Sequence, residues 1–100
     1  MSHKLIFVKG VDDDLADAVE WYEDRQINLG LKFIKDWEMT LDYVMTEPLS
    51  FEIRHKIFRH ANFKTFPFII VFEIEKNTIT IYSIIHAKRM PAKRYGRIKT

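Results

Sequence analysis

The chain has no cysteine, only three glycines and three prolines, and no apolar run long enough to cross a membrane. Without cysteine, neither a disulfide framework nor a thiolate metal site can form, and the reducing cytoplasm is the natural compartment. The apolar run at residues 5–8 is far shorter than the roughly 20 residues of a membrane span. We therefore expect a cytoplasmic protein without a membrane partner.

Phosphate loops and metal motifs are missing as well. Gly10, Gly30 and Gly96 are far apart, so no glycine-rich phosphate loop can be assembled from neighbouring residues. His55 and His60 lie five residues apart in one predicted strand, where they should point to opposite faces. Neither has a Cys, Asp or His at ligand spacing. We expect no metal site and no cofactor.

The residues that are present suffice for one core. The 100 residues are 47% hydrophobic and 14% aromatic, and a chain of this length buries roughly two-thirds of its unfolded surface. There is no internal repeat, linker or low-complexity segment. Residues 1–100 are therefore predicted to form a single domain.

The charges are distributed unevenly along the chain. The net charge is +2, but residues 1–50 carry five cations against eleven carboxylates, whereas residues 51–100 carry eleven cations against three. The contrast is greatest in residues 84–99, where an apolar run leads into six cations and no carboxylate. A basic second half favours an anionic partner. The alternative is a solvated basic tail that only aids solubility.

The first half of the chain predicts a strand followed by two helices. Residues 3–10 are a short β-branched and aromatic run, and residues 11–30 begin with three aspartates that suit a helix N-terminus. In residues 31–48, apolar positions at spacings of three, four and seven predict a second helix. This stripe consists of Phe33, Ile34, Trp37, Leu41, Val44 and Met45. The short connection predicts an αα-hairpin that covers one sheet.

The second half supplies the rest of that sheet. Apolar runs at residues 53–61, 66–75 and 78–86 predict three strands, the last two joined by a short turn at Lys76 and Asn77. The middle run is apolar at both parities, which is typical of a central strand covered on both faces. The prediction is a two-layer α+β fold, with a helical hairpin on an antiparallel or mixed four-stranded sheet. The element order is β-α-α-β-β-β, followed by a basic C-terminal tail.

Strand geometry also predicts where the cations gather. If Phe58 points toward the helices, then Arg59 must point to the opposite, open face of the sheet. The carboxylates of the first helix are interpreted as a solvated polar face. The predicted binding surface consists of Arg59, His86, Lys88, Arg89, Lys93, Arg94, Tyr95 and Arg97. Such a surface would attract phosphate or a carboxylate-rich peptide; the alternative is a set of scattered surface cations.

The order of short motifs resembles a known family. The motifs are Trp21-Tyr22-Glu23, Leu29-Gly30 with Phe33, Phe66-Pro67-Phe68, and Ile84-Ile85-His86 with Arg89 and Pro91. From the first strand to Pro91, this series resembles the plasmid-stabilisation toxins of the ParE/RelE superfamily, and specifically their ParE-like branch. The resemblance implies the toxin of a type II toxin–antitoxin pair, neutralised by a cognate antitoxin. Assembly as a homodimer or as a heterotetramer with the antitoxin is also implied.

Two activities are known in the superfamily. ParE-like members poison DNA gyrase by binding it, whereas RelE-like members cut messenger RNA on the ribosome. Carried over to this chain, a nuclease would use Arg59, Lys88, Arg89 and Tyr95, but the middle-strand arginine of such nucleases falls near the uncharged Ile69. We therefore expect a non-enzymatic inhibitor whose target is DNA gyrase. The alternatives are a ribosome-dependent endoribonuclease and an inert relative that only binds the antitoxin.

Overall fold

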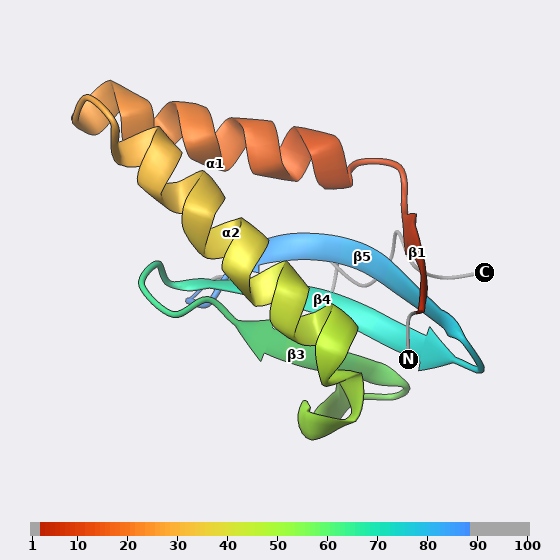
Figure 1. The fold of residues 1–100 in the computed structure, drawn as a ribbon. Coiled ribbons are helices and arrows are strands. Elements are labelled where there is room, and N and C mark those ends of the chain that lie inside the picture. The colour runs from red at the N-terminus through yellow and green to blue at the C-terminus, as the bar shows by residue number, and fades with distance from the viewer. Residues whose placement is uncertain (1–2, 89–100) are drawn as a thin grey trace.

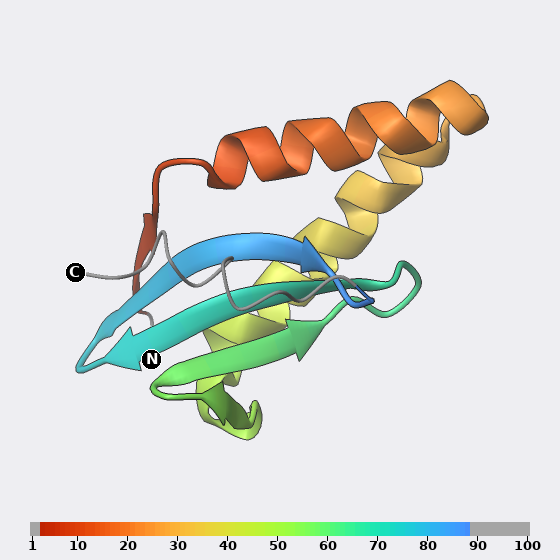
Figure 2. The same cartoon turned by 180° about the vertical axis from the view of Figure 1, so that it is seen from behind.

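The computed structural model describes residues 3–88, and these form two helices and five strands. The elements are β1 (Lys4–Phe7), α1 (Val11–Arg25), α2 (Leu29–Thr46), a short 3-10 helix (Pro48–Ser50), β2 (Ile53–His55), β3 (Phe58–Asn62), β4 (Phe68–Glu75) and β5 (Thr78–His86). Both helices lie on the same face of the sheet (Figures 1 and 2). The predicted α+β class, the two layers and the helical hairpin are confirmed.

The sheet is mixed and has the strand order β1-β5-β4-β3-β2. The first strand, β1, runs parallel to β5, and the other neighbours are antiparallel. This order places β4 in the centre, between β5 and β3, as the continuous apolar sequence of β4 predicts. It also brings the C-terminal end of β5 beneath α1, so that the first helix and the last strand form one region of the molecule (Figure 1).

The sheet has one strand more than the prediction. Residues 53–61 were expected to form one strand, but the chain reverses at Lys56, whose φ of 54° is left-handed, and β2 pairs with β3. No Gly, Asn or Pro marks this turn, so the sequence carries no ordinary hairpin signal there. The reversal makes His55 the partner of Phe58, with stacked rings 6.5 Å apart. The prediction that His55 and His60 point to opposite faces is therefore wrong, because Phe58 and His60 share a face.

The two helices are joined by a cap that the sequence does not reveal. Both Asn28 and Gly30 donate their backbone N–H groups to the carboxylate of Glu23 at 2.9 Å, which satisfies a donor that helix geometry leaves unpaired at the start of α2. A Cβ on Gly30 would lie 3.0 Å from Glu23 Oε1 and from the Val19 carbonyl oxygen. The Trp-Tyr-Glu and Leu-Gly motifs thus have a packing role, and Glu23, although exposed, caps the start of α2.

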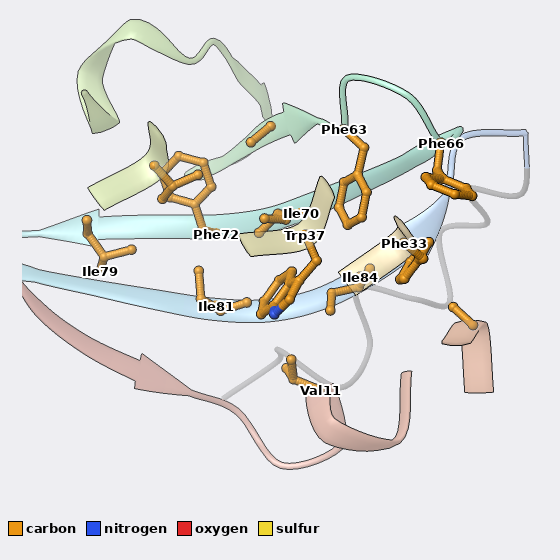
Figure 3. Close-up of a cluster of buried hydrophobic side chains, with 13 residues drawn as sticks. Val11, Phe33, Trp37, Phe63, Phe66, Ile70, Phe72, Ile79, Ile81 and Ile84 are labelled. Carbon is orange, nitrogen blue, oxygen red and sulfur yellow. The ribbon is translucent and has the colours of Figure 1, made fainter. Parts of the chain in front are cut away.

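The main core lies between the helices and the sheet (Figure 3). Its fully buried residues include Phe33 and Val44 from α2 and Ile70, Phe72 and Ile81 from the central strands. The predicted α2 stripe is thereby confirmed for Phe33, Trp37 and Val44 in the core and for Leu41 and Met45, which pack against it. Burial of an aromatic or branched side chain stabilises a fold by about 1.5–3 kcal/mol, so this cluster accounts for the position of the hairpin over the sheet.

A buried carboxylate fastens the loop between β3 and β4 to the second helix. Asp36 is only 2% exposed. Its carboxylate oxygens accept the backbone N–H groups of Lys64, Thr65 and Phe66 at 3.0, 2.8 and 2.9 Å. A carboxylate that accepts several N–H groups offsets the cost of its burial. The contact positions the chain that enters β4 at Phe68.

Candidate functional site

The orientation predicted for Arg59 is wrong. Its neighbour Phe58 belongs to a second buried cluster, on the sheet face away from the helices, with Ile69, Val71 and Ile85. Arg59 pairs with Phe72 of the main core, and its Nη1 donates to the Phe51 carbonyl oxygen at 2.6 Å. Both sheet faces are apolar, so an aromatic residue in β3 does not reveal which of the two alternating sets of side chains faces the helices.

The structure separates Arg59 from the other described members of the predicted site. His86 pairs with Phe68, and the Lys88 N–H donates to His86 Nδ1 at 3.1 Å. Arg59 pairs with Phe72, which lies four residues along β4 from Phe68, the partner of His86. Since β3 and β5 are also two strands apart, the backbones of Arg59 and His86 are separated by roughly 16 Å. His86 and Lys88 are therefore neighbours, whereas Arg59 lies elsewhere on the helix side. The remaining members, Arg89, Lys93, Arg94, Tyr95 and Arg97, lie outside the described residues.

The sheet face away from the helices carries no lysine or arginine side chain from β3, β4 or β5, as far as residues 3–88 are concerned. Alongside the apolar cluster it has His60, whose pKa is lowered by burial and then by Arg54 and His55. It also has Tyr82, which donates to Glu73 at 2.7 Å. Burial and this hydrogen bond raise the pKa of Tyr82 to about 12. Neither group is a cation at neutral pH.

A hollow of about 230 Å³ lies between α1 and the ends of β4 and β5. Its lining consists of Asp14, Asp17, Ala18, Trp21 and Tyr22 from α1 with Phe68, Ile84 and His86 from the strands. The carboxylate of Asp14 ties the helix to the sheet, since its Oδ2 accepts the Ile84 N–H at 3.3 Å. Of the predicted site residues that the structure describes, His86 lines this hollow, whereas Arg59 and Lys88 do not.

Aromatic rings form the walls of the hollow. The Tyr22 ring meets Trp21 edge-on at 5.1 Å and Phe68 at 6.1 Å, and the Phe68 ring meets His86 at 5.2 Å. Burial raises the pKa of the Tyr22 phenol. Arg25 lies over the Trp21 ring, 3.3 Å from its centroid. Rings of this kind, next to carboxylates, favour a cationic ligand group over an anionic one.

No family model and no curated protein matches the chain. Its structure is similar to a chain of the solved structure of the chromosomal ParDE TA system from P. aeruginosa, with a TM-score of 0.72 and 17% sequence identity. The match covers 85% of this chain and 96% of that chain. The two chains share a fold. At this identity the likeness concerns the fold, and function has to be argued from the residues.

The described residues contain no group of three or more His, Cys, Asp or Glu placed to hold a metal ion. No helix among them is long and apolar enough to span a membrane.

The sequence interpretation missed the hollow because its carboxylates looked like an ordinary polar helix face. The available signal was the spacing of Asp14, Asp17 and Trp21, which places all three beside the small Ala18 on one side of α1.

Proposed function

We propose that the chain is the toxin of a type II toxin–antitoxin pair, a growth inhibitor that acts by binding its target and is neutralised by a cognate antitoxin. The similarity to a ParDE-system chain supports the toxin–antitoxin context. The observation that favours binding over RNA cleavage is the composition of the sheet face away from the helices. Its central strands carry a buried apolar cluster with Tyr82 and His60, and residues 3–88 place no lysine or arginine from these strands there.

Cleavage of a phosphodiester needs cations beside the reacting phosphate, where negative charge grows in the transition state. Of the residues that a RelE-like nuclease would use, Arg59 donates to the Phe51 carbonyl oxygen on the helix side. It is separated from Lys88 by the width of two strands and half the length of β4. Docking on another protein needs no such convergence, because separate anchor residues can each contribute.

DNA gyrase is the proposed target, and the basic C-terminal residues are the proposed contact surface together with His86 and Lys88. Six cations in residues 84–99 can supply arginine anchors of the kind that dominate protein interfaces. The antitoxin is proposed to cover the same surface. The proposed assembly is a homodimer of the chain or a heterotetramer of the chain with the antitoxin. A role in plasmid stabilisation follows if the pair is plasmid-borne.

Growth and supercoiling assays test this function. Expression of the chain alone should stop division, and co-expression of the small gene beside it should restore growth. Purified chain should inhibit supercoiling by gyrase and should leave a translated message uncut. Arg89→Ala should lower toxicity without altering the unfolding free energy by more than about 0.5 kcal/mol, with Lys32→Ala as the matched control on α2.

Each contrary result has a distinct meaning. Cleavage of the translated message would identify the endoribonuclease instead. Normal division of cells that accumulate folded chain, together with binding to the neighbouring gene product, would identify an inert antitoxin-binding module. Undisturbed gyrase in the presence of growth arrest would refute the proposed target and retain the toxin.

A further inference from the structure

The hollow between α1 and the sheet has the size of one amino-acid side chain. Its volume of about 230 Å³ is smaller than the roughly 300–1,000 Å³ of pockets that enclose small-molecule ligands. Trp21, in its lining, is half exposed, and Asp17, one turn away on α1, is exposed. The hollow is therefore open to a side chain that approaches along the outer surface of the first helix.

The charge of this region is negative on the helix side. Both Asp14 and Asp17 line the hollow, and α1 as a whole carries seven carboxylates against one cation, Arg25. Arg25 lies at the C-terminal end of the helix, where its guanidinium covers the Trp21 ring and donates to the Trp21 carbonyl oxygen. An incoming cation is favoured by this field, and a phosphate or carboxylate is repelled.

The walls select among cations. Flat rings from Tyr22 and Phe68 line the space beside Trp21, one face of which Arg25 already covers. A guanidinium stacks on such rings because it is planar and more weakly hydrated than an ammonium. A carboxylate at the edge can accept two of its N–H groups at once. The Nδ1 atom of His86 already accepts the Lys88 N–H, so it does not compete with the carboxylate as an acceptor for the guanidinium. The combination suits arginine better than lysine.

We propose that this hollow is the docking site for an arginine side chain of the partner protein, with its guanidinium against Asp17 and the aromatic walls. The identification of that partner as the antitoxin rests on the proposed function. Such an antitoxin segment would present carboxylates to the basic second half of the chain and an arginine to α1. Opposite charges at two separate places favour one register of binding and exclude the shifted ones.

A peptide titration of the full chain tests the proposal without the antitoxin. The probe is the capped peptide Ala-Leu-Arg-Leu-Ala, and its control has Gln in place of Arg. The arginine peptide should shift the NMR signals of the Trp21 indole N–H and the His86 ring, and the glutamine peptide should bind at least about five-fold more weakly. Asp17→Asn should weaken the arginine peptide by at least about five-fold. Asp12→Asn, on the same helix but outside the hollow lining, should change it less than about two-fold.

Equal affinities for the two peptides, no shift at millimolar peptide, or equal effects of the two variants would overturn the proposal. Arg89→Gln tests whether the chain's own tail occupies the hollow. If this variant moved the Trp21 signal without peptide, and raised the peptide affinity about as much as Asp17→Asn lowers it, the occupant would be the tail. That result would also overturn the proposal. These outcomes are independent of toxicity. A chain that binds the arginine peptide but never slows growth keeps the docking site and loses the proposed function.

Discussion

Removal of the Asp36 carboxylate should unfasten the β3–β4 loop from α2. In the folded chain this carboxylate is almost fully buried and accepts three backbone N–H groups, from Lys64, Thr65 and Phe66. Asp36→Ala removes every acceptor at once. The Phe66 N–H is then left in a buried position, whereas the other two donors are only partly buried and can reach water.

The size of the effect follows from the donors that lose their partner. An orphaned buried N–H costs about 1–3 kcal/mol, and a hydrogen bond to a charged group contributes about 1.5–3 kcal/mol. Full cost for Phe66 and partial cost for the other two donors gives about 3–5 kcal/mol. Since a domain of this kind has only about 5–15 kcal/mol of stability, Asp36→Ala should leave a marginally folded chain. Asp36→Asn keeps one acceptor oxygen and should cost less.

Chemical denaturation followed by circular dichroism measures the difference. The matched control is Asp42→Ala, which removes an exposed carboxylate from the same helix and should change the unfolding free energy by no more than about 0.5 kcal/mol. If Asp36→Ala and Asp42→Ala agree within about 1 kcal/mol, the three N–H groups do not depend on Asp36 and the loop is held by its aromatic contacts alone.

Three further outcomes are expected. Gly30→Ala should lower stability by about 1–3 kcal/mol in thermal unfolding, because the new methyl group would crowd Glu23 Oε1 and the Val19 carbonyl oxygen; an unchanged melting temperature would contradict this. His60 has a lowered pKa, so the unfolded chain takes up this proton first and stability is lost as the pH falls below about 6.5; His60→Gln should flatten that part of the profile. Tyr82 has a pKa of about 12, so stability is lost as the pH rises from about 10 toward that value; an ultraviolet titration in which Tyr82→Phe loses no late-ionising phenol would refute it.

Local patterns were sufficient for the elements and their order, except for the turn that divides residues 53–61 into β2 and β3. A helix stripe such as Phe33, Trp37 and Val44 repeats every three or four residues, and a strand run such as residues 78–86 is recognisable without knowing its neighbours. The helical hairpin, the central position of β4 and the α+β class follow from such short-range periodicities. The same holds for the charge contrast between the halves, which is a property of composition.

Contacts between distant residues decided everything about the site. Whether Arg59 faces the helices depends on its pairing with Phe72, and both faces of the sheet are apolar enough to allow either parity. The burial of Asp36 likewise depends on partners far along the chain. The hollow exists only because β5 passes beneath α1, where Asp14 meets the Ile84 N–H across 70 positions. Periodicity identifies which residues can share a face, but only packing determines what that face meets.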